Sequence, residues 1–191
     1  MLGSVRNGNS KIKRIVLNGL MIALVFLVTY FTKIPGPVGY FNLGDVAIII
    51  AAVILGKYSG FIAGAFGSAL ADIFVGFAFF APVTFLVKGL EGFLTGYIIH
   101  SLGSRLKIRE GVTRIIAIVA GCTFMVMGYF LAETYILSVV SSEYGLAQAL
   151  TELPTNVVQG VVSIVAGYAI TTQLLKIRAV KRIAAEAASK E

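Results

Sequence analysis

Five ionisable side chains lie inside or at the edge of strongly apolar stretches of this chain: Asp72, Lys88, Glu91, Glu133 and Glu152. A charged group within hydrocarbon is costly, so such residues usually mark a ligand site, an ion path or a contact with a partner. Lys88 and Glu91 are three residues apart, which places them on one face of a helix where they can pair. The chemistry that these residues offer is hydrogen bonding and ion pairing with a polar ligand.

The composition indicates whether these apolar stretches lie in water or in lipid. Of the 191 residues, 58% are hydrophobic and 13% are charged, and the mean hydropathy is +0.91. An ordinary soluble domain is about half apolar and about a quarter charged. At about 20 residues for each spanning helix, the chain has room for about six helices and no separate soluble domain. We therefore predict an all-α integral membrane protein with six transmembrane helices, in which residues 1–191 form a single membrane domain.

Several other classes of protein do not fit this sequence. The segment Gly56-Lys57 is followed by Tyr58, so it lacks the phosphate-binding Gly-Lys-Ser/Thr signature of an ATPase. Cys122 is the only cysteine, which excludes an intramolecular disulfide or a cysteine metal cluster. His100 is the only histidine, and we expect it to be structural, because no metalloprotease motif or nucleophile elbow accompanies it. The sequence predicts no enzyme, metal or cofactor.

Proline, glycine and charged residues divide the chain into helices. Pro35 and Pro37 end the first helix, whereas Pro82 suits the first turn of the fourth and Pro154 marks the start of the last. The first apolar run lacks a small-residue cleavage site, so we interpret it as a spanning helix rather than a signal peptide. The second helix is too short to span alone. The expected helices are 12–32, 45–55, 57–76, 82–101, 112–138 and 152–176, followed by a basic tail at 177–191.

The basic residues predict the orientation in the bilayer. Of the 16 Lys and Arg residues, all but Lys33 and Lys88 fall at 6–14, at Lys57, at 105–114 or after 175, and these places share one side of a six-helix topology. Basic residues concentrate on the cytoplasmic side, so we predict that both termini are cytoplasmic. This pattern favours a multi-pass membrane protein. Nucleic acid is not an expected partner, because the basic residues lie at helix ends rather than along one exposed face.

This topology brings the charged residues to one outward-facing level. With a rise of about 1.5 Å per residue, Lys88 lies about 9 Å and Glu133 about 8 Å below the outer ends of their helices. One reading is a polar pocket closed by the loop 33–44 and the turn 76–82. The other is a structural ion pair with carboxylates that reach outward. The residues predicted to line the pocket are Tyr40, Asn42, Asp72, Phe79, Thr84, Lys88, Glu91, Tyr129, Glu133, Asn156 and Gln159.

Small residues recur at four-residue intervals in two of the expected helices. Gly60, Gly64 and Ser68 form one such row, and Gly92 and Gly96 form another. Rows of this kind let helices approach closely in lipid. We therefore expect them to serve helix packing rather than ligand binding.

A series of short motifs runs from the loop after the first expected helix into the fourth. They are Gly39-Tyr-Phe-Asn-Leu-Gly-Asp45, Leu55-Gly56, Gly60, Ala63-Gly64, Gly67-Ser68, Ala71-Asp72, Ala81-Pro82 and Lys88-Gly-Leu-Glu-Gly92. Together these motifs resemble the substrate-binding S component of energy-coupling factor (ECF) transporters, and the resemblance covers residues 12–176. Within that group the sequence is most similar to the branch for riboflavin, hydroxymethylpyrimidine or pyridoxine uptake. The resemblance implies a location in the plasma membrane of a prokaryote.

The resemblance implies a division of labour between subunits. A protein of this kind captures a water-soluble vitamin at the outer face and then topples in the bilayer when docked on a transmembrane T component driven by two ABC ATPases. The absence of a nucleotide motif fits this arrangement. Family members dock through small residues on the first helix, and the corresponding pair here is Gly19 and Ala23.

Two other functions stay open at this point. A proton- or cation-coupled carrier would also place carboxylates in its helices, and it would transport without ATPase partners. An integral membrane enzyme could use Asp72 or Glu133 as a base, and it would turn over a lipid-like substrate alone. The sequence does not select the ligand, because Lys88 and Glu91 would suit the polar edge of a pyridine, a pyrimidine or a flavin.

Overall fold

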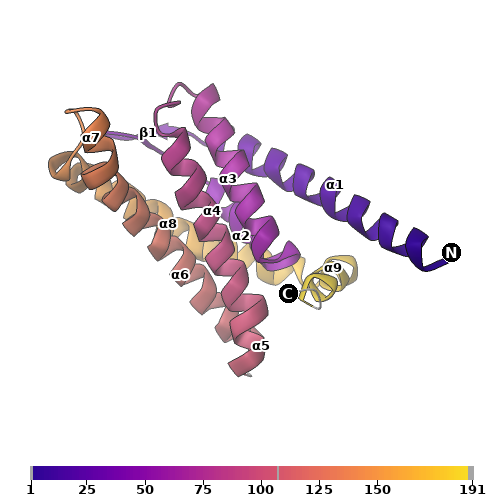
Figure 1. Ribbon diagram of the computed structural model, residues 1–191. Coiled ribbons are helices and arrows are strands. Elements are labelled where there is room, and N and C mark those ends of the chain that lie inside the picture. Colours follow the sequence, from indigo (N-terminus) through magenta and orange to yellow (C-terminus); the bar gives the residue numbers. More distant parts are fainter. Residues whose placement is uncertain (1, 107, 189–191) are drawn as a thin grey trace.

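The computed structural model describes residues 2–106 and 108–188, without the side chains of residues 2–10, 104 and 106. The basic residues Lys107 and Lys190 and the side chain of Arg6, which entered the orientation argument, lie outside this description. The chain is almost entirely helical (Figure 1). The elements are α1 (Leu2–Phe31), β1 (Ile34–Pro35), β2 (Tyr40–Phe41), α2 (Gly44–Leu55), α3 (Lys57–Phe74), α4 (Ala81–Tyr97), η1 (Ile98–Leu102), α5 (Gly103–Leu106), α6 (Glu110–Leu131), η2 (Ala132–Leu137), α7 (Ser138–Val140), α8 (Leu146–Leu174) and α9 (Arg178–Ala188).

Helix α2 forms the centre of the bundle. Nearly all of its residues are buried, and it packs against α1, α3, α4 and α8. Its sequence is apolar on every side, as expected for a helix that is surrounded by other helices. Gly56 connects it to α3 with a φ of 91°, a conformation that glycine adopts without strain. Asp45 in the first turn of α2 is thereby fixed in the interior of the protein.

Among the described residues, three helical segments are long and apolar enough to cross a bilayer: Lys11–Phe31, Glu110–Val140 and Leu146–Leu174. Their outward faces carry many exposed aliphatic side chains, such as Leu20, Ile116 and Val165. Such surfaces suit lipid rather than water, and the protein is an α-helical membrane protein. As predicted from the sequence, α2 is too short to span by itself. The total number of crossings stays a prediction.

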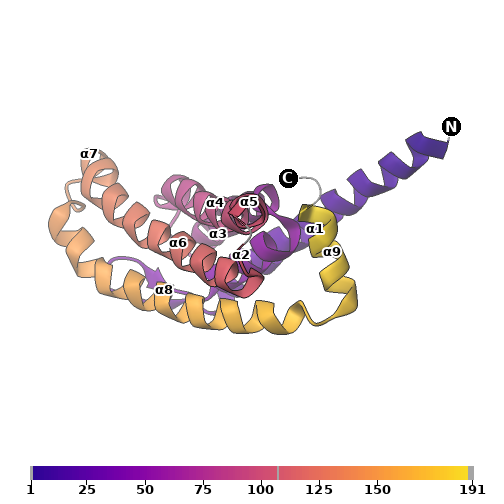
Figure 2. The ribbon, with the colours of Figure 1, turned by 90° about the horizontal axis from the view of Figure 1, so that it is seen from below.

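Both termini lie at the end of the bundle opposite α7 and the β1–β2 hairpin (Figure 1). Figure 2 shows α8 running the length of the molecule and α9 turning back from its end towards α1. Lys13 of α1 and Glu186 of α9 form an ion pair at 2.9 Å, which joins these two elements. The common side of the termini agrees with the predicted topology, and its assignment to the cytoplasm stays a prediction.

Several of the expected boundaries were wrong. The last long helix begins at Leu146 rather than at residue 152, and Pro154 lies within it. A proline removes only one backbone hydrogen-bond donor from a helix. The carbonyl that loses its partner here belongs to Leu150, an exposed residue, so the helix can continue through Pro154. The first helix begins at Leu2 instead of residue 12, and its N-terminal part extends beyond the apolar stretch.

Other differences concern segments between the helices. The fourth helix continues past residue 101 through the π-helical turn η1 into α5, and the fifth runs from Glu110 to Val140 with the π-helical turn η2 inside it. The loop at 33–44 contains a two-stranded hairpin in which Ile34 pairs with Phe41 and Pro35 with Tyr40. The basic tail forms the amphipathic helix α9, which the sequence analysis did not anticipate.

The glycine rows serve helix packing, as predicted, and the structure shows that they bring α3 directly against α4. A Cβ atom on Gly60 would lie 2.6 Å from the backbone oxygen of Gly92, and one on Gly64 would collide with the backbone oxygen of Lys88. The backbones of the two helices are therefore in contact at these positions. This close approach fixes the height at which Lys88 enters the interior.

Candidate substrate-binding site

Lys88 is the centre of a buried polar network. Its ammonium group forms an ion pair with Asp45 at the start of α2, and it lies 3.7 Å from Glu91 Oε2 one helical turn further along α4. All three side chains are almost fully inaccessible to solvent. Cys122 of α6 also contacts Glu91, with a distance of 4.0 Å between Sγ and Oε1. The predicted pairing of Lys88 with Glu91 is confirmed, and Asp45 is a second partner.

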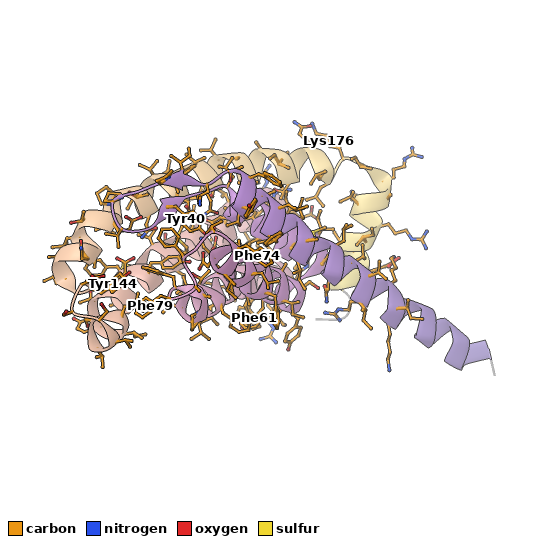
Figure 3. All side chains as sticks on the ribbon, turned by 90° about the horizontal axis from the view of Figure 1, so that it is seen from above. Tyr40, Phe61, Phe74, Phe79, Tyr144 and Lys176 are labelled. Carbon is orange, nitrogen blue, oxygen red and sulfur yellow. The ribbon has the colours of Figure 1, made fainter. Side chains whose placement is uncertain are left out.

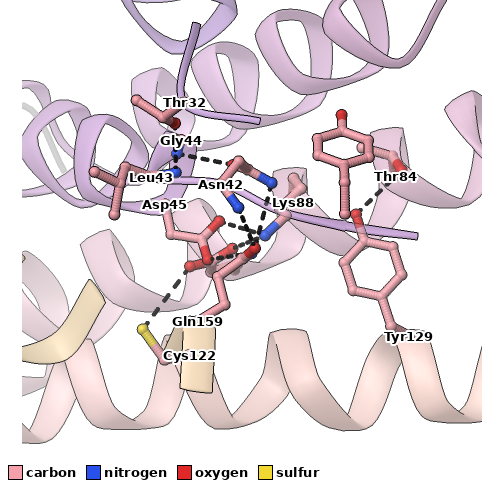
Figure 4. Close-up of polar contacts among 12 residues, drawn as sticks. Thr32, Asn42, Leu43, Gly44, Asp45, Thr84, Lys88, Cys122, Tyr129 and Gln159 are labelled. Atoms are coloured by element: carbon pink, nitrogen blue, oxygen red, sulfur yellow. Dashed lines mark hydrogen bonds and ion pairs between the residues drawn. The ribbon is translucent and has the colours of Figure 1, made fainter. Parts of the chain in front are cut away.

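Gln159 of α8 connects this cluster to the segment before α2. Its Nε2 donates to Asp45 Oδ2 at 2.9 Å, while its Oε1 accepts from the backbone N–H of Asn42 at 2.9 Å (Figure 4). The side chain of Asn42 in turn accepts from the backbone N–H of Gly44 at 2.8 Å. The ion pair and these hydrogen bonds thus hold α2, α4, α8 and the segment after the hairpin in fixed positions relative to one another.

A cavity of about 50 Å³ lies beside Lys88, towards the hairpin. Lys88 Nζ is 5.4 Å from the ring centroid of Tyr129, and the hydroxyl of Tyr129 donates to Thr84 Oγ1 at 3.1 Å. An aromatic face therefore stands next to the cation on one wall. The cavity is lined by Thr29, Gly39, Tyr40, Asn42, Ser68, Asp72, Phe80, Thr84, Lys88, Tyr129, Glu133, Glu152, Asn156 and Gln159.

The hairpin closes this cavity through hydrogen bonds to two carboxylates. The phenol of Tyr40 donates to Asp72 of α3, and the backbone N–H of Val38 donates to Glu152 Oε2 of α8 at 3.0 Å. Burial raises the pKa of the Tyr40 phenol above its usual range, so the hydroxyl stays protonated and available as a donor. The hairpin is thus joined to helices on both sides of the cavity.

Some buried oxygen atoms at the cavity have no hydrogen-bond partner among the described residues. They are Asp72 Oδ2, Glu133 Oε2 and Thr29 Oγ1, and all three residues line the cavity. Unpaired buried acceptors are costly, so their concentration at one place needs an explanation. Two carboxylates with free acceptor positions, opposite an ammonium group, form a site that can accept hydrogen bonds from a polar ligand.

Most of the predicted site residues meet at this cavity. Nine of the eleven line it; Glu91 lies behind Lys88, and Phe79 is 42% exposed and stacks on Tyr144 at 5.4 Å. Phe80, its neighbour, lines the cavity instead. Whether these residues bind a ligand stays a prediction. In the described part of the chain, no group of three or more His, Cys, Asp or Glu side chains is arranged to hold a metal ion.

Sequence reasoning missed four polar or backbone positions. Asp45 was treated as a helix start, although it belongs to the motif Gly39–Asp45 and its burial could have been inferred from the apolar helix that follows. Asp45 contacts Lys88 and Gln159 without lining the cavity, whereas Thr29, Gly39 and Ser68 do line it. Nothing in the sequence context of these three residues distinguishes them from packing residues. Their role depends on which helix faces become neighbours.

The proposed docking residues lie far from this network on α1. Gly19 and Ala23 are both exposed, and a Cβ atom on Gly19 would meet no other atom within 4 Å. The described structure thus leaves this part of α1 accessible to another helix. Its use as a docking surface stays a prediction.

The fold and the site together define a class: a helical membrane protein with an enclosed polar cavity near one end of its bundle. The chain belongs to the family of ECF-type riboflavin transporters, S component, which matches residues 9–176. The resemblance inferred from the motifs is therefore confirmed. This membership makes the chain a multi-pass, substrate-binding subunit for vitamin transport.

Two relatives are similar over most of their length. The thiamine precursor transporter HmpT of Lactococcus lactis subsp. cremoris (strain MG1363) is 30% identical over 160 residues, which cover 82% of this chain and 84% of the relative. The second relative, from Pyrococcus woesei, is described as "Uncharacterized protein in gap 3'region". It is 34% identical over 145 residues, which cover 75% of this chain and 88% of the relative.

Proposed function

We propose that this chain captures a single-ring heteroaromatic vitamin precursor of the hydroxymethylpyrimidine type and holds it in the cavity beside Lys88. The observation that carries this proposal is that Lys88 lines the same cavity as Asp72 and Glu133, each of which has an oxygen without a hydrogen-bond partner among the described residues. The similarity to a thiamine precursor transporter supports the same class of ligand.

The donor and acceptor pattern of the cavity suits such a ring. A hydroxymethyl-substituted aminopyrimidine carries an exocyclic amino group and a hydroxyl, which can donate to Asp72 and Glu133, and ring nitrogens that can accept from Lys88. Directional hydrogen bonds from several sides of the cavity would fix the orientation of the ring. The face of Tyr129, next to Lys88, offers a surface on which a flat ring can pack.

The size of the cavity favours one ring over a flavin. A volume of about 50 Å³ holds only a few water molecules, so a ring can enter only if the hairpin moves outward. The bonds from Tyr40 to Asp72 and from Val38 to Glu152 would then break and re-form over the ligand. A single ring requires the smaller displacement, whereas the three fused rings and side chain of riboflavin require a much larger one.

Transport requires partners in this proposal. The chain acts as one membrane domain in a prokaryotic plasma membrane, receives the ligand from outside, and delivers it by toppling on a T component that two ABC ATPases drive. The exposed small residues Gly19 and Ala23 on α1 would form the contact with that component. Family membership supports this division of labour.

The proposal is tested by calorimetric titration of the purified chain with hydroxymethylpyrimidine, pyridoxine and riboflavin. We expect the pyrimidine to bind most tightly and riboflavin to bind weakly. Tighter binding of riboflavin would contradict the substrate class while leaving the site intact. In vesicles, the chain alone should bind but not accumulate the ligand; concentrative uptake without partner subunits would instead favour an ion-coupled carrier.

A further inference from the structure

A hollow larger than the cavity beside Lys88 lies at the end of the bundle where the chain termini are. Its volume is about 660 Å³, and it lies between the end of α8, the start of α6 and the tail helix α9. Figure 3 shows Lys176, which lines it, far from Tyr40 and Tyr144 at the opposite end. We call it the tail cavity.

The tail cavity carries an excess of positive charge. Arg114, Lys176 and Lys181 line it, and Glu110 is the one carboxylate among its described lining residues. These cations come from three separate segments: α6, the turn after α8, and α9. Because separate elements bring them to one hollow, the charge is concentrated at a place that an anion can enter.

The guanidinium group of Arg114 is held in place by stacking, and one of its hydrogen-bond donors has no acceptor among the described residues. It lies over the ring of Tyr168, with 5.1 Å between Cζ and the ring centroid. Its Nε is buried and has no hydrogen-bond acceptor among the described residues. A guanidinium group held by stacking retains its donors for a planar or tetrahedral anion, and arginine is well suited to phosphate.

The depth of the tail cavity matches the headgroup region of a bilayer. Two apolar spans end there, one beginning at Glu110 and the other ending at Leu174. Aliphatic side chains, such as Ile99, Ile108 and Leu175, form much of the remaining wall, and the polar residues there are His100, Thr113 and Thr172. A ligand that fits this arrangement has an anionic group for the cations and an apolar portion beside it.

We propose that the tail cavity binds the phosphate headgroup of an anionic phospholipid from the leaflet on the side of the termini. Arg114, Lys176 and Lys181 would contact the phosphate, and the aliphatic wall would contact the glycerol and the first acyl carbons. Basic residues next to spanning helices attract anionic lipids, by about 1 kcal/mol for each Lys or Arg. This inference does not rest on the proposed substrate, because the two cavities share no lining residue.

The test measures lipid retained by the purified full-length chain, without any vitamin present. The chain is reconstituted in nanodiscs with equal amounts of phosphatidylglycerol and phosphatidylcholine, released, and examined by native mass spectrometry. The variants are Arg114→Gln, Lys181→Gln and their combination. Arg178→Gln is the matched control, since Arg178 is exposed on α9 and does not line the tail cavity. Arg114→Lys keeps the positive charge but removes the guanidinium group. It therefore separates the effect of charge on lipid retention from the effect of stacking on Tyr168.

We expect wild type, Arg178→Gln and Arg114→Lys to retain phosphatidylglycerol over phosphatidylcholine. Each cavity cation removed should lower retention about fivefold. Equal retention of both lipids, or an equal loss in Arg178→Gln, would overturn the proposal in favour of diffuse surface charge. Competition by inorganic phosphate without lipid retention would identify a soluble anion as the ligand. If the cavity variants lost copurification with the T component while their lipid retention stayed unchanged, the ligand of the tail cavity would be a protein. That result would also overturn the proposal.

Discussion

At the scale of single residues, Lys88 has two roles that must be separated experimentally. It lies between the buried carboxyl groups of Asp45 and Glu91, and it also lines the cavity. Removing one partner of a buried ion pair leaves an uncompensated charge, which is strongly destabilising. A loss of binding in a Lys88 variant is therefore informative only when stability is measured beside it.

We expect Lys88→Ala to weaken ligand binding by about 1–3 kcal/mol and to lower the free energy of unfolding by about 3–5 kcal/mol. Glu91→Gln should also weaken binding by about 1–3 kcal/mol with helices intact, because it loosens the position of Lys88. Calorimetric titration and thermal unfolding of the same samples provide the comparison. Unchanged titrations for both variants would return the pair to a purely structural role.

At the scale of elements, the contact between α3 and α4 determines where Lys88 stands. A methyl group on Gly64 would collide with the backbone oxygen of Lys88, and backbone atoms cannot move aside as a flexible side chain can. Gly60, Gly64 and Gly92 therefore contribute to the site without lining the cavity.

We predict that Gly64→Ala lowers the free energy of unfolding by about 1–3 kcal/mol, the usual range for overpacking, and weakens ligand binding as well. Gly19→Ala is the matched control, since a Cβ atom there meets nothing within 4 Å. Both are glycine-to-alanine changes within helices, so their difference isolates the packing effect. Equal stability of the two variants in denaturant or thermal unfolding would show that α3 and α4 can separate freely.

The tail helix α9 should respond to acid. The hydrogen bond and the charge of Lys13 hold the pKa of the Glu186 carboxyl below its usual range. A carboxyl whose pKa is lowered in the folded state stabilises that state above its unfolded pKa, about 4.3, and the contribution is lost as pH falls through the lower folded value. We expect the contact between α1 and α9 to loosen below about pH 4.

Spin labels on α1 and α9 would report this loosening as a longer and broader distance distribution in acid. The variant Glu186→Gln should show the loosened distribution already at neutral pH, with little further change on acidification. If this variant retained the same pH response as wild type, another group would be responsible.

At the scale of the whole molecule, the binding cavity and the proposed docking surface lie in different places. Gly19 and Ala23 are exposed on α1, and the cavity near the hairpin does not include them. Capture and transport can therefore be disturbed independently.

We predict that Gly19→Leu or Ala23→Leu reduces copurification with the T component and ATP-dependent uptake, because a bulky side chain prevents close helix approach in lipid. Ligand affinity of the isolated chain should stay within about twofold of wild type, since exposed substitutions change little. Ala169→Leu on the exposed face of α8 is the matched control. Lost affinity with intact copurification would assign these residues to internal packing.

The sequence by itself determined the class of the protein. Composition indicated a helical membrane protein, glycine spacing predicted close helix packing, and the rarity of charges in apolar segments singled out Lys88, Asp72 and Glu133. These inferences succeeded because each depends on solvent or on local helical geometry. The motifs from Gly39 to Gly92 gave the family for the same reason, since they lie close together along the chain.

Only the tertiary structure decided which polar groups meet. Asp45 lies 43 residues from Lys88 and 114 from Gln159, and no local pattern pairs them. Likewise, Phe80 rather than Phe79 lines the cavity, because the rotation of a short turn sets which ring faces inward. The tail helix α9 forms a cavity wall only because it turns back from the end of α8 towards α1 (Figure 2). Such contacts depend on packing between distant segments, which periodicity and composition do not encode.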